Sequence, residues 1–223
     1  MAETLNYILF DFWELEGDPR ISSYIFFKGG PWLTWSIIAF YIYFVKSLGP
    51  SLMKNREPFV LKYPILFYNV GMILYNAFFF YQIVVTYRFG IDMNMWEFER
   101  PDWKDTSPKV MKIVQLAFLF LLSKFLDLIE TVFFILRKKQ NQLSNLHIYH
   151  HSVVPILVHT FAKISPGGGP GTMFPFLNCF IHIGKFFHYF FFLSLSLSLS
   201  LCLSFSRQRF LKIFKKSFKT VFY

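Results

Sequence analysis

Long hydrophobic segments alternate with short charged stretches along most of the chain. Five segments stand out, at roughly 32–48, 65–87, 110–136, 147–164 and 173–205. Each approaches or exceeds the ~20 apolar residues that an α-helix needs to cross a bilayer, although the fourth is short and rich in histidine. The pattern therefore predicts an all-α, multi-pass transmembrane helical bundle of about five spans.

The composition supports a membrane protein and adds a basic charge. Apolar residues make up 54% and aromatic residues 22% of the 223 residues, yet the net charge is +10. In a membrane protein this excess indicates cytosolic loops and anionic partners, including membrane lipid, rather than nucleic acid. The two cysteines lie in apolar stretches, which argues against a disulfide framework and a cysteine zinc site. The start of the chain lacks the basic residues of a signal peptide, so no cleaved leader is expected.

The charge of the loops alternates in sign and predicts an orientation. Residues 1–30 carry five acids and two bases, whereas the loop after the first segment carries four bases and one acid. The loop after the third segment contains Arg137, Lys138 and Lys139 and no acid. The positive-inside rule then places the N-terminus outside the cytosol and these two basic loops inside it.

Three histidines stand within five residues at the predicted cytosolic end of the fourth segment. His147, His150 and His151 share one face of a helix, because positions i, i+3 and i+4 are neighbours there. Ionisable side chains in a spanning segment usually mark a working site. Imidazole can ligate a metal, or it can act directly as a base or nucleophile. Metal-dependent desaturases and hydroxylases use similar histidine boxes, but they need about eight histidines and this chain has six, so catalysis without a metal is the preferred interpretation.

The third segment carries a lysine and two carboxylates near the same end. Lys124, Asp127 and Thr131, and more loosely Glu130, lie on one side of the predicted helix. At that depth the charged groups should face the protein interior and pair. They either form a structural ion-pair network or orient the imidazoles of the histidine cluster.

A basic cluster follows this helix directly. Arg137, Lys138 and Lys139 are either an ordinary cytosolic anchor or a dock for phosphate groups. Coenzyme A carries three phosphates, so an acyl-CoA would suit this position.

Glycine and proline at 166–171 end the fourth helix and predict a turn on the non-cytosolic side. His182 then lies ~15 Å into the fifth segment and could meet the histidine cluster from across the bundle. His159 and His188 are interpreted as ordinary hydrogen-bonded core histidines.

These motifs together resemble the very-long-chain fatty acid elongases of the endoplasmic reticulum, over about residues 25 to 183. The family pattern is Lys-x-x-Glu-x-x-Asp-Thr, Leu-Arg-Lys-Lys, His-x-x-His-His, a Pro-Gly-rich turn and Asn-x-x-x-His. Here it reads Lys124-x-x-Asp127-x-x-Glu130-Thr131, Leu136 to Lys139, His147-x-x-His150-His151, 166–171 and Asn178-x-x-x-His182. The two acids at 127 and 130 are exchanged, which keeps both charges.

The resemblance implies the condensation of malonyl-CoA with a long-chain acyl-CoA, giving 3-oxoacyl-CoA, carbon dioxide and CoA. It implies no cofactor and no metal, and a ping-pong mechanism through an acyl-imidazole in the endoplasmic reticulum membrane. His150 would accept the acyl group with His182 close by, and His147 and His151 would orient it or transfer protons. The remaining site residues would position the histidines (Lys124, Asp127, Glu130) or bind substrate (Arg137, Lys138, Lys139, Asn178). Association with itself or with other enzymes of the elongation cycle is a further expectation.

The resemblance ends after Ile183. Where the family continues with Met-Tyr-x-Tyr-Tyr and two more spans, this chain continues with Gly184-Lys185, a phenylalanine run and Leu-Ser repeats. Such repeats are what a CTCTCT microsatellite encodes, and Gly-Lys can be encoded by a splice-donor sequence. We therefore expect an incomplete elongase-like domain at 1–183 and a translated-intron tail at 184–223. Spliced transcripts that diverge near codon 184 would support this, whereas uninterrupted coding into the repeats would refute it.

A chain of five spans would lack one wall of the tunnel that a long acyl group needs, so this form is expected to be unstable or inactive. Two alternatives stay open. One is a di-iron desaturase or hydroxylase, and the other is a non-catalytic partner of intact elongases.

Overall fold

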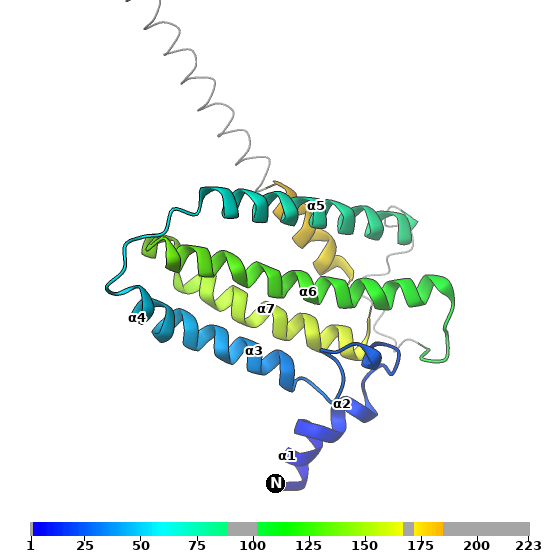
Figure 1. The fold of residues 1–223 in the computed structure, drawn as a ribbon. Helices are drawn as coiled ribbons and strands as arrows, with labels where there is room; N and C mark the ends of the chain where they lie inside the picture. The colour runs from blue at the N-terminus through cyan, green and yellow to red at the C-terminus, as the bar shows by residue number, and fades with distance from the viewer. Residues whose placement is uncertain (1, 89–101, 167–171, 185–223) are drawn as a thin grey trace, which may run out of the picture. The chain divides into compact units, whose positions relative to one another are not determined.

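Helices form every regular element in the described residues, which are 2–88, 102–166 and 172–184 of the computed structural model. The chain divides into two compact units, Met1–Phe180 and Ile181–Tyr223, and the labelled helices of Figure 1 belong to the first. The predicted all-α class is therefore confirmed. In chain order the elements are α1 (Ala2–Asn6), η1 (Tyr7–Asp11), α2 (Phe12–Leu15), η2 (Ile21–Ser23), α3 (Trp32–Tyr43), η3 (Phe44–Leu48), α4 (Gly49–Met53), α5 (Lys62–Thr86), α6 (Pro108–Leu136), η5 (Gln140–Gln142) and α7 (Asn145–Ile164).

Helix α6 is the central element of the first unit. It contacts α4, α5 and α7, while α3 packs on α7 (Figure 1). Helices α3, η3 and α4 follow one another without a break and form a single rod, Trp32–Met53. Because successive long helices run in opposite directions, the end of α6 and the start of α7 meet at one end of the bundle, on the left in Figure 1.

The helices agree closely with the predicted segments, but their suitability for a membrane differs. By length and composition two helices of the described residues can cross a bilayer, Trp32–Met53 and Lys62–Thr86. Helix α6 has 29 residues and is also long enough, but charged residues interrupt its apolar run. A further apolar helix, Thr172–Gly184, begins the expected fifth segment, and the rest of that segment lies outside the described residues. Three of the five expected spans thus remain predictions.

The outer faces of the two apolar rods carry large hydrophobic side chains. Phe67 and Leu74 on α5 are 76% and 66% exposed, and Phe40 on α3 is 61% exposed. A soluble protein rarely presents so much contiguous apolar surface to water, whereas lipid covers it without cost. The molecule is an all-α membrane protein.

Two apolar clusters fill the interior, and a polar layer separates them along α6. The first contains Val114, Phe120 and Leu121 of α6. The second contains Leu128 and Ile135 of the same helix. Three buried polar residues of α6 lie between these two groups, namely Ser123, Lys124 and Asp127, and a fourth, Thr131, follows one turn later.

The segment between α2 and α3 closes the opposite end of the bundle by polar contacts with the end of α7. The Asp18 amide donates to the Lys163 carbonyl over 2.7 Å, and Lys163 Nζ donates to Ser22 Oγ. The buried Asp18 carboxylate accepts from Arg20 Nη2 over 2.6 Å. This hydrogen-bonded pair raises the pKa of Arg20 further above its usual value. The segment is therefore fixed to α7 rather than free.

Candidate active site

The polar layer of α6 centres on a buried lysine. Lys124 is 2% exposed, and its Nζ donates to Asp127 Oδ2 over 2.6 Å and to Asn178 Oδ1 over 2.7 Å. The ammonium also lies 5.0 Å from the ring centre of Phe120. The predicted pairing of charges within this helix is confirmed for Lys124 and Asp127, and for Glu130 it stays a prediction. Asn178 accepts a hydrogen bond from Lys124, and its expected role in substrate binding stays a prediction.

A capping interaction sets the first turn of α7 and with it the histidine cluster. Ser144 is the N-cap, and its Oγ accepts from the His147 amide over 3.1 Å. The rings of His147 and His151 then lie with their centres 4.2 Å apart, one helical turn from each other. His150 lies beside them, with its ring centre 5.3 Å from that of His151. His151 is buried, His147 is half-buried and His150 is exposed, so the three imidazoles have different access to a substrate.

Two hydroxyl groups, one hydrogen-bonded to the other, hold the imidazole ring of His147. Thr131 Oγ1 lies 2.9 Å from His147 Nε2 and 3.0 Å from the Tyr41 hydroxyl. Tyr41 and Thr131 are both buried. The spacing of the third segment predicts that Thr131 shares a face of α6 with Lys124 and Asp127, but no sequence pattern indicates Tyr41. A tyrosine on an apolar helix carries no sequence signal that separates it from its aromatic neighbours.

Glu130 completes the cluster from the side of α6. One ligand atom from each of Glu130, His147 and His151 lies within 4.8 Å of the other two. The carboxylate can orient an imidazole or stabilise its protonated form, as sequence analysis expected. The described structure thus gathers Glu130, His147, His150 and His151 where the end of α6 meets the start of α7, while the Lys124–Asp127 pair lies deeper, near the middle of α6.

The basic cluster lies between these two helices. Arg137 is half-buried, and Lys138 and Lys139 are exposed. Lys138 has a φ of 53°, which turns the backbone sharply after α6. The two exposed ammonium groups are available to an anion near the histidine cluster, and their role in binding phosphate stays a prediction.

His182 follows Asn178 by four residues on the helix Thr172–Gly184. It belongs to the second unit, so its expected meeting with the histidine cluster stays a prediction. His159 is confirmed as a hydrogen-bonded core histidine, since its Nε2 lies 3.0 Å from the Phe26 carbonyl. His188 and the tail after Gly184 lie outside the described residues.

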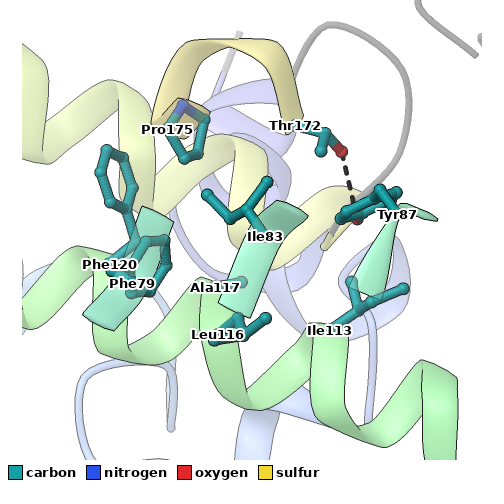
Figure 2. A pocket seen from close by; sticks show the side chains of 9 residues that line it. All are labelled: Phe79, Ile83, Tyr87, Ile113, Leu116, Ala117, Phe120, Thr172 and Pro175. Atoms are coloured by element: carbon teal, nitrogen blue, oxygen red, sulfur yellow. Dashed lines mark hydrogen bonds between the residues drawn. The ribbon is translucent and has the colours of Figure 1, made fainter. Parts of the chain in front are cut away.

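An apolar hollow continues from the polar layer along α5 and α6. Figure 2 shows Phe79 and Phe120 at one end of it and Tyr87 with Thr172 at the other. Thr172 Oγ1 donates to the Tyr87 hydroxyl over 3.3 Å. The cavity measures about 40 Å³, little more than the ~30 Å³ that one water occupies in the liquid. Along α6 the charged layer around Lys124 is therefore next to an apolar region.

Comparison with known proteins gives a consistent result. The family model described as ELO: GNS1/SUR4 matches residues 26–212, which extends past the boundary expected at Gly184. The chain is 38% identical to human very long chain fatty acid elongase 1 over 172 residues, 77% of this chain and 60% of that protein. It is 35% identical to rat very long chain fatty acid elongase 7 over 185 residues, 81% of this chain and 62% of that protein.

A third relative, very long chain fatty acid elongase 7 of Drosophila melanogaster, is 34% identical over 180 residues, 80% of this chain and 53% of that protein. The chain thus spans roughly three fifths or less of the length of these relatives. The match to the family model covers most of the chain, and the buried lysine and the histidine cluster lie within it. The chain belongs to the ELO (GNS1/SUR4) family, the family of the very long chain fatty acid elongases.

Proposed function

We propose that this chain carries the condensing site of fatty acid elongation, which joins malonyl-CoA to a long-chain acyl-CoA. The observation that carries the proposal is the arrangement of the three imidazoles. His150 is exposed to an incoming thioester, Thr131 forms a hydrogen bond with His147, and the Glu130 carboxylate lies near the rings of His147 and His151. A nucleophile next to an oriented base is the arrangement that acyl transfer needs.

In the first step a nitrogen of His150 attacks the thioester carbon of acyl-CoA. The carbon–sulfur bond breaks, CoA leaves as the thiol with a proton, and an acyl-imidazole remains. His151 lies close enough to His150 to accept or return that proton, directly or through one water. His147 and Glu130 keep His151 oriented.

In the second step malonyl-CoA loses carbon dioxide, and the electron pair of the broken carbon–carbon bond forms the new bond to the acyl carbon. The imidazole nitrogen takes up a proton from water as it leaves, and the product is a 3-oxoacyl-CoA two carbons longer. Lys138 and Lys139 suit the phosphates of CoA. At about 40 Å³ the hollow beside Phe120 is too small for a whole acyl chain, so in this proposal it contacts only a short part of the chain.

The proposal includes a multi-pass position in the endoplasmic reticulum membrane, with the histidine cluster facing the cytosol. It needs no cofactor beyond the two CoA substrates, and it leaves association with itself or with other elongation enzymes to be measured. The names of the relatives, all very long chain fatty acid elongases, support this assignment.

The test separates the first step from the full reaction. The purified chain is incubated with a long-chain acyl-CoA alone, and thiol release and acylated peptides are measured by mass spectrometry. We expect an acyl adduct on His150 that disappears in His150→Ala, while Tyr149→Phe, its exposed neighbour, keeps the adduct. Incorporation of radiolabelled malonyl-CoA is then compared for this chain and for one extended with the C-terminal region of the human relative. An adduct that survives His150→Ala, or no adduct in either chain, would contradict the proposal.

A further inference from the structure

Glu130, His147 and His151 form a group of side chains that are suited to bind a metal ion. Two imidazoles at i and i+4 on one helical face are an arrangement that binds zinc in other proteins. Their ring centres lie 4.2 Å apart here, and the Glu130 carboxylate approaches from α6. Two neutral imidazoles and one carboxylate offer nitrogen and oxygen ligands with one negative charge, which suits a divalent cation.

We propose that these three side chains form an inhibitory site for a divalent cation such as Zn²⁺. The inhibitory part of this inference rests on the proposed function, and the binding part does not. An ion at this site takes the lone pairs of His147 and His151, so neither ring can exchange a proton with His150. The exposed His150 imidazole then has no neighbouring imidazole to accept its proton, although the ion does not cover His150 itself.

The spacing of the ligand atoms indicates reversible binding rather than a permanent structural metal. The three atoms lie within 4.8 Å of one another. Around one zinc ion, with bonds of ~2.0–2.1 Å, tetrahedral ligand atoms must lie ~3.4 Å apart. The side chains must therefore move together by up to ~1.5 Å, which costs part of the binding energy. His147 is also held by Thr131, which opposes this movement.

The first experiment measures binding without any substrate. The full chain in detergent is titrated with Zn²⁺ by calorimetry, and with Co²⁺ by visible absorption, which reports the number of nitrogen and oxygen ligands. We expect one ion per chain. Glu130→Gln and His151→Asn should each weaken binding by more than the ~10–100-fold that loss of an outer partner causes. His150→Gln is the matched control, since it removes a neighbouring histidine outside the group.

Each outcome decides the inference. Absence of binding, or equal loss of binding in His150→Gln, overturns the site. Because Glu130 is half-buried, Glu130→Gln should keep the fold, which unfolding curves without metal verify.

The second experiment adds Zn²⁺ to the acyl-transfer assay and then a chelator. Inhibition at the concentration that saturates binding, with full recovery, supports the regulatory part, and unchanged transfer at saturation overturns it. Acyl transfer that requires the ion would overturn both this inference and the proposed function.

Discussion

The ammonium group of Lys124 lies in the apolar interior with two polar partners, the Asp127 carboxylate and the Asn178 carboxamide oxygen. Burying a charge without a partner is far more costly than burying a pair. Removing one charge of the pair Lys124–Asp127 should therefore destabilise the protein more than removing both.

Lys124→Met should destabilise the folded protein strongly, because it leaves the Asp127 carboxylate buried without its lysine. We expect a loss of about 3–5 kcal/mol in the free energy of unfolding. The double variant Lys124→Met with Asp127→Leu should recover most of that loss, since it removes both charges. Unfolding in mixed detergent micelles measures both. A single variant as stable as the original chain would contradict the role of the pair.

Tyr41→Phe tests the hydroxyl chain to His147. The substitution removes one buried hydrogen bond and should cost about 1 kcal/mol of stability. Because Thr131 then loses one of its two partners, His147 should be less well oriented, and kcat for acyl transfer should fall severalfold at unchanged KM. Tyr43→Phe is the control, since Tyr43 lies on the same helix but is 55% exposed. A rise in KM alone, or equal effects at both positions, would remove Tyr41 from the site.

Spacing along one helix could be predicted from the sequence, and contacts between helices could not. The pair Lys124–Asp127 and the clustered histidines follow from positions three and four apart. The contact from Thr131 to Tyr41 spans 90 residues. Nothing in the sequence of an apolar helix shows which of its aromatic residues faces a distant threonine, so that part of the site needed the structure.

Among the elements, the segment after α2 depends on a glycine. A Cβ at Gly17 would overlap the Trp13 carbonyl oxygen and Lys163 Cε. Gly17→Ala should therefore displace the contact with the end of α7 and destabilise the protein by about 1–3 kcal/mol. Gly71→Ala in α5 is the matched control, because its Cβ would meet no atom within 4 Å and should stabilise the helix by up to ~1 kcal/mol. Thermal unfolding compares the two, and equal effects would contradict the close contact.

Helices α5 and α6 enclose the apolar hollow, and its width should influence the choice of substrate. Ala117→Leu places extra carbon atoms in the cavity. We expect the selectivity for a shorter over a longer acyl-CoA to rise by about tenfold, because one methylene in an apolar pocket has an effect of this size. Ala77→Leu adds the same bulk to an exposed position of α5, outside the cavity, and should change nothing. Competition between two acyl-CoA lengths in the acyl-transfer assay measures this ratio, and an unchanged ratio in Ala117→Leu would separate the hollow from the acyl chain.

The boundaries of α5, α6 and α7 could be predicted to within three residues, because hydrophobic length and flanking charges determine them, whereas the helical segment Ala2–Leu15 was not predicted. The short π-helical stretch between α3 and α4 could not be predicted. It arises inside an uninterrupted apolar run, where Gly49 brings α4 close to Ile135 of α6. Such a deviation depends on the neighbouring helix rather than on local sequence.

At the scale of the whole molecule, exposed apolar residues are expected to contact lipid at some positions and water at others. Leu74 lies midway along α5 and is 66% exposed, whereas Leu146 in the first turn of α7 is 75% exposed. Leu74→Arg should reduce insertion of α5, at a cost of about 2.5–3.5 kcal/mol for an arginine at the centre of a span. Leu146→Arg should be tolerated, because that end of the bundle is predicted to reach the cytosol. Glycosylation mapping in microsomes measures both, and equal tolerance would place Leu74 outside the hydrocarbon layer.

The distance in sequence between Lys124 and Asn178 has a consequence for how the protein is made. Fifty-four residues separate them, so the ribosome releases α6 well before the amide that completes its polar layer. Asp127, three residues away on the same helix, can neutralise the lysine at once, before Asn178 has been made. The newly inserted helix should keep one side hydrated until residue 178 emerges, and during that interval it is exposed to quality-control factors.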